Sequence, residues 1–192
     1  MSAPGGVVAT WGTTPGERGR PFPCDPKVSQ PDDVLFRGVS VDAPAAVVYR
    51  WLCQLRVAPY SYDWLDNYGR TSPRGLTPGL DQLAVGQEVM RIFRLVEFAP
   101  DDHLTLMLRR ASSAWRTFGD LAVTYRVVPE SSARCRLLVK LVVRYPTGLW
   151  GALMRRVLPL GDLVMMRKQL RTLKRLAEKA PPSSVVGAAS RR

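Results

Sequence analysis

Alternating apolar and polar positions in the middle of the chain predict a series of β-strands. Leu104, Leu106 and Leu108 would form one apolar face, and Leu137 and Val139 begin another that continues at every second residue. Each predicted strand is joined to the next by a short turn, which is typical of an antiparallel meander. The first strand is apolar on both sides, so the pattern does not orient it. The four strands are expected at about 88–98, 103–110, 116–128 and 135–145.

A further strand and two short helices are predicted before the meander. Residues 33–41 alternate in the same way, with Arg37 on the apolar face of the strand. A helix is expected after Asp42-Ala43-Pro44, because proline fits the first helical position and aspartate can accept hydrogen bonds from free N–H groups. A second short helix is expected at 61–68. Residues 69–86 are rich in glycine and proline and are expected to form mostly loop.

The longest helical pattern lies near the C-terminus, over about 159–179. Its apolar residues recur at steps of three and four, and they are Leu163, Met166, Leu170, Leu173 and Ala177. About 19 helical residues would span roughly 28 Å, enough to lie across a sheet. Residues 149–158 are expected to form no more than a helical turn or two before it.

These elements together predict an α+β helix-grip fold. An antiparallel sheet with one wet face must cover its other face, and the C-terminal helix is the predicted element long and apolar enough to do so. A curved sheet wrapped on this helix would leave a cavity between them. Residues 33–179 are expected to form this ligand-binding domain. Residues 1–32, which are rich in proline and glycine without periodicity, are expected to be a disordered arm, and 180–192 a disordered tail.

Charge is distributed unevenly along the chain. Residues 131–192 hold 14 Lys/Arg against 2 Asp/Glu, which accounts for the whole net charge of +12. Three interpretations remain open: a solvated helix face, contact with anionic lipid through Trp150, Arg155 and Arg156, or nucleic-acid binding. Nucleic acid is disfavoured, because Trp150 is the one aromatic residue interleaved with the charge where stacking would require several.

Residue types that carry chemistry are sparse. The three cysteines are far apart, and the lone histidine, His103, follows two aspartates in a predicted turn, where an exposed structural residue is expected. No catalytic or metal-binding motif is present, so no catalytic residue, metal or cofactor is expected. The N-terminus has no signal-peptide pattern and no apolar run could span a bilayer, which favours a cytoplasmic protein, with peripheral membrane attachment as an alternative.

Four segments resemble the SRPBCC superfamily, which comprises START-like and birch-allergen-like helix-grip proteins, including polyketide cyclase and lipid-transport relatives. They are VDAPAAVVYRWLCQL at 41–55, YSYDWLDNYG at 60–69, RCRLLVKLVVR at 134–144 and GDLVMMRKQLRTLKRLAEKA at 161–180. The resemblance covers about 34–179. It implies a cavity for a hydrophobic ligand but no single chemistry, because members include carriers, sensors, cyclases and chaperone activators.

Six residues are candidate ligand contacts. Arg37 would either pack its stem with its head at the sheet edge, or grip a carboxylate or phosphate at the cavity mouth. Tyr125 and Tyr145 would either pack in the core or line the cavity with their hydroxyls. Trp64 belongs to an aromatic cluster expected over the cavity entrance. The apolar face of the C-terminal helix contributes the remaining two, Met166 and Leu170.

The function expected from these observations is binding or transport of a small hydrophobic or amphipathic ligand, lipid-like or polyketide-like, in an internal cavity. One alternative is a polyketide cyclase/aromatase-type enzyme, which could rely on cavity shape with a few tyrosine or arginine groups. Another is a peripheral membrane protein that docks through its basic C-terminal region. The sequence does not predict an oligomeric state.

Overall fold

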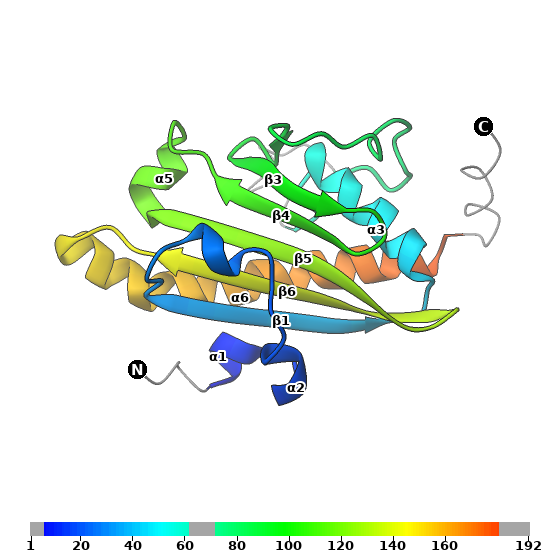
Figure 1. Cartoon of the computed structure of the whole chain (residues 1–192), viewed down its shortest axis with the longest axis horizontal. Helices are drawn as coiled ribbons and strands as arrows, with labels where there is room; N and C mark the ends of the chain where they lie inside the picture. The colour runs from blue at the N-terminus through cyan, green and yellow to red at the C-terminus, as the bar shows by residue number, and fades with distance from the viewer. Residues whose placement is uncertain (1–5, 62–71, 181–192) are drawn as a thin grey trace.

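The computed structural model describes residues 6–61 and 72–180 (Figure 1). The described strands form a six-stranded antiparallel sheet in the order β1-β6-β5-β4-β3-β2, and the long helix α6 lies across one of its faces. In chain order the elements are α1 (Val7–Thr10), α2 (Pro15–Arg18), η1 (Asp25–Lys27), β1 (Asp33–Val41), α3 (Ala45–Cys53), η2 (Gln54–Arg56), β2 (Glu88–Val89), β3 (Phe93–Ala99), β4 (His103–Leu108), α5 (Ser113–Phe118), β5 (Asp120–Ser131), β6 (Arg134–Arg144) and α6 (Gly148–Glu178).

The predicted α+β helix-grip class is confirmed. The alternating residues of β1, β4, β5 and β6 point to one side, where they form a single core with α3 and α6. Leu106 and Leu137 are fully buried there, as is Leu170 from α6. Burial of apolar surface at about 25 cal/mol per Å² is what holds the helix on the sheet.

The C-terminal helix is longer than predicted. It begins at Gly148 rather than near Pro159 and runs for 31 residues, about 46 Å at 1.5 Å per residue. Pro159 lies inside it without ending it, although proline lacks the N–H that an interior position normally uses. Met154 and Leu158 of the added segment are buried. Tertiary packing of this kind outweighs local propensity.

Two parts of the predicted meander differ from the structure. The first strand is divided into β2 and β3, because Met90 and Arg91 have positive φ angles of 48° and 63° and interrupt the extended backbone. A register shift between Leu95 and Glu97 interrupts the alternation of β3 as well, so no single apolar side runs through the predicted strand. The third strand was predicted to begin at 116, but residues 113–118 form helix α5, capped by Ser112, whose side chain accepts a hydrogen bond from the Trp115 N–H.

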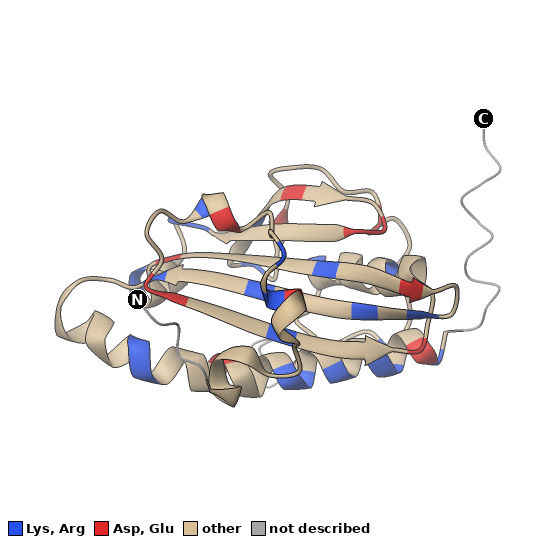
Figure 2. Ribbon diagram, turned by 60° about the horizontal axis from the view of Figure 1, so that its bottom comes forward, with Lys and Arg blue, Asp and Glu red and all other residues tan. Residues whose placement is uncertain are grey.

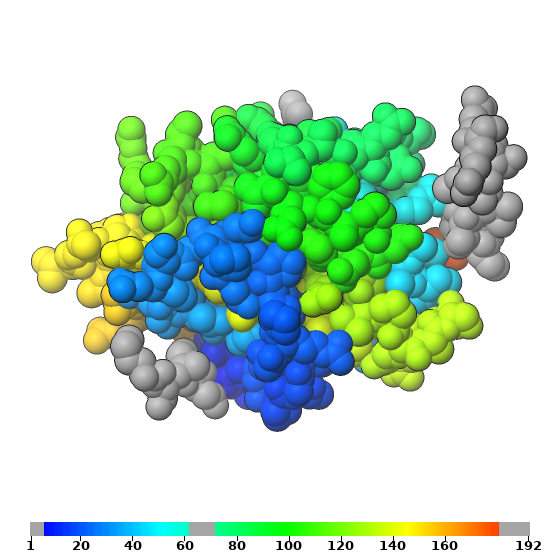
Figure 3. Space-filling model, in the orientation of Figure 1, coloured from blue at the N-terminus to red at the C-terminus, as the bar shows by residue number. Residues whose placement is uncertain are grey.

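The prediction of a disordered N-terminal arm is wrong for residues 6–32. Helix α1 lies beside β1 and contacts α6, and the segment then crosses the outer face of the sheet, opposite α6 (Figures 1 and 3). Phe22, Cys24 and Val28 are buried there against Leu138 and Val142 of β6. These three buried residues lie in a largely irregular segment, so they do not recur with the period of a helix or a strand and the sequence pattern did not reveal them.

The same segment neutralises two basic residues of β6. Glu17 binds Arg136, with an Nε–Oε1 distance of 2.7 Å, and Asp25 binds Lys140, with an Nζ–Oδ1 distance of 2.5 Å. Lys140 is buried and also lies over the ring of Phe22. Arginine and lysine on this strand therefore hold the N-terminal segment to the sheet.

Some predictions fall outside the described residues: most of the helix at 61–68, the residue Trp64 and the tail from 181 onward. Residues 72–87 form the expected loop. Within the described ranges, no helix has the length and apolar character needed to cross a membrane.

Candidate ligand-binding site

A buried ion pair joins the sheet to α6 where the sequence placed a candidate ligand contact. The Arg37 side chain is 1% exposed, and its Nη2 lies 2.7 Å from Oδ2 of Asp162. The guanidinium also donates hydrogen bonds to the carbonyl oxygens of Phe36 and Pro159. Burial raises the pKa of Asp162 to about 6, even though Arg37 opposes that rise. The Arg37 side chain therefore lies on the edge strand β1 and faces α6 from beneath it.

A second polar contact lies further along the same helix. The Tyr125 hydroxyl donates to Oε1 of Gln169 at 2.8 Å, and Nε2 of Gln169 donates to the carbonyl of Pro59 at 2.6 Å. The Sδ atom of Met166 is 3.8 Å from the same hydroxyl, and Leu170 is fully buried. Three predicted contacts, Tyr125, Met166 and Leu170, thus come together between the sheet and α6. Burial raises the pKa of Tyr125, which therefore stays protonated.

Tyr145 is placed apart from that group. Its hydroxyl donates to Oδ2 of Asp33 at 2.9 Å, and burial together with Asp33 raises its pKa. Arg155 lies over its ring at 5.8 Å and pairs with Asp32 at 2.7 Å. Tyr145 therefore belongs to a polar group at the start of β1, and its role as a ligand contact stays a prediction.

The predicted membrane-surface residues differ in their surroundings. Trp150 is 49% exposed and donates its indole N–H to the carbonyl of Thr117. Arg156 is exposed, whereas Arg155 is engaged with Asp32. A membrane role for these residues stays a prediction at this point.

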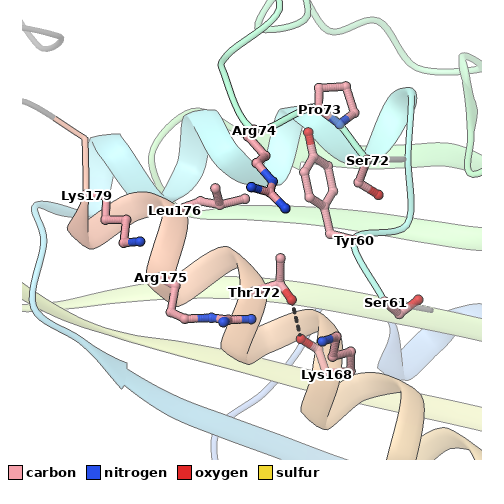
Figure 4. A pocket seen from close by; sticks show the side chains of 10 residues that line it. All are labelled: Tyr60, Ser61, Ser72, Pro73, Arg74, Lys168, Thr172, Arg175, Leu176 and Lys179. Carbon is pink, nitrogen blue, oxygen red and sulfur yellow. Dashed lines mark hydrogen bonds between the residues drawn. The ribbon is translucent and has the colours of Figure 1, made fainter. Parts of the chain in front are cut away.

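A hollow of about 340 Å³ lies beside the C-terminal half of α6, facing the loop that follows residue 71 (Figure 4). This volume is within the range of small-molecule sites. Arg74 from the loop and Arg175 from α6 point toward the same space, and the ring of Tyr60 stands beside them. The lining residues are Tyr60, Ser61, Ser72, Pro73, Arg74, Lys168, Thr172, Arg175, Leu176 and Lys179.

The lining of this hollow is cationic. Of the described residues that line it, four are basic, Arg74, Lys168, Arg175 and Lys179, and none is acidic. Among residues 6–61 and 72–180, no carboxylate forms an ion pair with any of the four. Hydroxyl groups and the apolar surfaces of Tyr60, Pro73 and Leu176 complete it. Such a combination suits a ligand with a negative end and an apolar body.

Sequence reasoning missed this hollow, although part of its signal was present. Lys168, Thr172, Arg175 and Lys179 recur at steps of four and three, which places them along one edge of a helix. They had been interpreted as its solvated back. Arg74 faces this edge because of the way its loop folds over the helix. Helical spacing gives no information about the path of that loop.

The histidine and the three cysteines are buried within the fold. His103 begins β4 and is buried, not exposed as predicted, with Nδ1 3.0 Å from Oδ2 of Asp102. Cys24, Cys53 and Cys135 are buried free thiols whose pKa values are raised by burial. In the part of the chain that the structure describes, no three His, Cys, Asp or Glu side chains gather into a group that could hold a metal ion.

Comparison with known proteins gives the fold a name. No family model matches the chain, and no curated protein matches it. Among solved structures, the Zhui aromatase/cyclase from Streptomyces sp. R1128 is similar with a TM-score of 0.50 and 15% identity, over 76% of this chain and 93% of that chain. The chain has the helix-grip fold.

Two further helix-grip structures are similar at lower TM-scores. A START superfamily protein from Mycobacterium smegmatis has a TM-score of 0.46 and 14% identity over 76% of this chain and 97% of that chain. A protein from Thermobifida fusca has a TM-score of 0.48 and 17% identity over 74% of this chain and 92% of that chain. Sequence identities of this size leave the ligand undetermined.

Proposed function

We propose that this helix-grip protein binds a small amphipathic ligand with an anionic end, lipid-like or polyketide-like, in the hollow beside α6. The observation that carries the proposal is the ring of four basic side chains around a space of about 340 Å³. The fold supports it, because the similar structures include a START superfamily protein and an aromatase/cyclase. Arg74 and Arg175 would bind the anionic end, and Tyr60 and Leu176 would contact the apolar body.

Binding rather than catalysis is the function that the lining supports. The described residues around the hollow offer cations, hydroxyls and apolar carbons, and they include neither a carboxylate nor an imidazole for proton transfer. The buried Arg37–Asp162 pair lies between the sheet and α6, outside the lining of the hollow. An aromatase/cyclase-type activity therefore stays the alternative, with a carrier or sensor as the proposed role.

The test compares charged and uncharged forms of one apolar chain. Binding of monomeric oleate and of its methyl ester to the full chain is measured by calorimetry, below the concentrations at which either aggregates. The double variant Lys168→Gln/Arg175→Gln removes two charges at the hollow, and Arg20→Gln/Arg94→Gln removes two exposed charges elsewhere. We expect the first variant to weaken oleate binding about tenfold and ester binding by less than about twofold, with the second variant unchanged.

The outcomes separate the proposal from its alternatives. Equal weakening of oleate and ester in the hollow variant would show that the cations do not select the anionic end. Failure of the unmodified protein to bind oleate or a long-chain alkyl phosphate would refute the proposed function itself.

A further inference from the structure

The first half of α6 exposes a line of large apolar side chains, here called the α6 stripe. At 100° per residue the five members fall within an arc of about 80° on the helix. Leu149 is 92% exposed, and the other four are between 47% and 55% exposed. The members are Leu149, Leu153, Val157, Leu160 and Val164. Trp150, 49% exposed, borders the stripe.

The fold itself does not use this stripe. The core side of the same segment is formed by Met154 and Leu158, which are buried. In Figure 1 the N-terminal end of α6 also extends past the edge of the sheet. Single exposed apolar residues are ordinary, but a continuous row over more than four helical turns marks an interaction surface.

The outer side of α6 changes character along its length. Past Val164 the same angular line continues with Arg167 and Arg171, and Arg156 borders the stripe itself. The helix contains seven Lys/Arg and two Asp/Glu. Both acids are occupied, since Asp162 pairs with Arg37 and Glu178 pairs with Lys174. Figure 2 shows the basic residues as repeated blue turns along the helix.

A second hollow adjoins the stripe. It measures about 330 Å³, lies between α1 and α6, and has apolar walls from Val8, Pro159 and Leu160. Arg155 and Arg156 stand among its lining residues. This hollow therefore combines apolar surface with neighbouring basic residues, as the outer side of α6 does.

We propose that the outer side of α6 docks on an anionic lipid membrane, with the α6 stripe at the boundary between head groups and acyl chains. Helices that lie in this plane combine one apolar side with flanking cations, as α6 does. The cations of its second half would contact lipid phosphates and carboxylates. A second copy of the chain is a poorer occupant, because it would bring another +12 charge against the same surface.

This docking goes beyond ligand binding in the hollow and does not depend on it. The test measures co-flotation of the full chain with vesicles of phosphatidylcholine alone and of phosphatidylcholine mixed with phosphatidylserine. The stripe variant is Leu153→Ser/Val157→Ser, and the control is Val85→Ser, which changes a valine that is 65% exposed in the loop before β2. All three side chains are exposed, so neither variant removes core packing.

We expect binding to the mixed vesicles to exceed binding to phosphatidylcholine vesicles at least tenfold, and to weaken with added salt. The stripe variant should reduce vesicle binding about tenfold while leaving oleate binding unchanged, and the control should bind as the unmodified protein does. A blue shift of tryptophan emission on vesicle binding that is reduced in Trp150→Phe would place this end of α6 in the membrane.

Two results would overturn the proposal. One is binding of the stripe variant to mixed vesicles as strong as that of the unmodified protein. The other is a dimer in solution, seen by sedimentation, that the stripe variant converts to monomer, which would make the stripe an interface between copies. Loss of oleate binding with intact vesicle binding would instead contradict only the proposed ligand site.

Discussion

Replacing Arg37 by methionine should destabilise the protein, mainly because the buried carboxylate of Asp162 loses its ion-pair partner. Asp162 has an 11% exposed side chain, and its nearest cation is the Arg37 guanidinium at 2.7 Å. Breaking a buried ion pair by removing one partner costs about 3–5 kcal/mol of unfolding free energy. Methionine keeps much of the apolar stem, so most of this loss reflects charge and not volume.

The loss should depend on pH in a defined direction. The pKa of Asp162 is about 6 in the folded protein against an ordinary value of 3.8, so the folded state binds this proton more tightly than the unfolded state. The stabilising effect of that proton is fully present below about pH 3.8 and is lost as the pH rises through about 6. The difference between the two pKa values corresponds to about 3 kcal/mol. Without Arg37 the pKa of Asp162 rises further, which moves the loss to higher pH.

Urea unfolding followed by circular dichroism at pH 5 and pH 8 measures the effect. We expect Arg37→Met to lose about 3–5 kcal/mol at pH 8 and clearly less at pH 5, where Asp162 becomes protonated. The double variant Arg37→Met/Asp162→Leu removes both charges and should recover most of the loss at pH 8. Equal losses of the single variant at both pH values, or no recovery in the double variant, would refute this reasoning.

Further predictions concern two matched pairs, each measured by the same urea unfolding. Tyr125→Phe should lose about 1–3 kcal/mol, because it leaves the buried Oε1 of its glutamine partner without a donor. Tyr49→Phe should lose nothing measurable, since the Tyr49 hydroxyl is buried with no hydrogen-bond partner among the described residues. Gly151→Ala should lose more than about 2 kcal/mol, because its Cβ would meet a backbone oxygen of Pro146. Gly161→Ala meets no atom within 4 Å and should gain up to about 1 kcal/mol of helix stability. A loss for Tyr49→Phe equal to that for Tyr125→Phe, or a gain for Gly151→Ala, would contradict these assignments.

The sheet was predictable because strand alternation is a local signal that reports burial directly. Leu137, Val139 and Leu141 occupy every second position, and each is buried against the helix. The N-terminal segment was not predictable in the same way. Its anchors, Phe22 and Cys24, lie in irregular backbone, and their burial depends largely on strands β5 and β6, more than 90 residues further along the chain.

The candidate site likewise has residues that a local pattern predicts and residues whose positions depend on tertiary packing. Tyr125, Met166 and Leu170 lie together between the sheet and α6, because each is on the apolar side of an element with a clear period, and their role as ligand contacts stays a prediction. The partner of Arg37 was missed, since pairing strand β1 with Asp162 of α6 requires the register of the helix on the sheet. The first half of α6 was underestimated because its exposed apolar residues obscure the amphipathic pattern that marks a helix against a core.

The basic residues of the C-terminal third fall into two groups. Those of β6 hold the N-terminal segment, and those of α6 face the ligand hollow and the outer side of the helix. Arg136 and Lys140 are neutralised by acids of the N-terminal segment, so they add little to the field outside the protein. The remaining excess is concentrated on α6, where Lys168 and Arg175 line the ligand hollow and Arg167 and Arg171 continue the line of the α6 stripe. Ligand and membrane binding should therefore share a dependence on salt, because both use cations of this helix. Substitutions in the α6 stripe should weaken membrane binding and leave ligand binding unchanged, since none of the five stripe residues lines the ligand hollow.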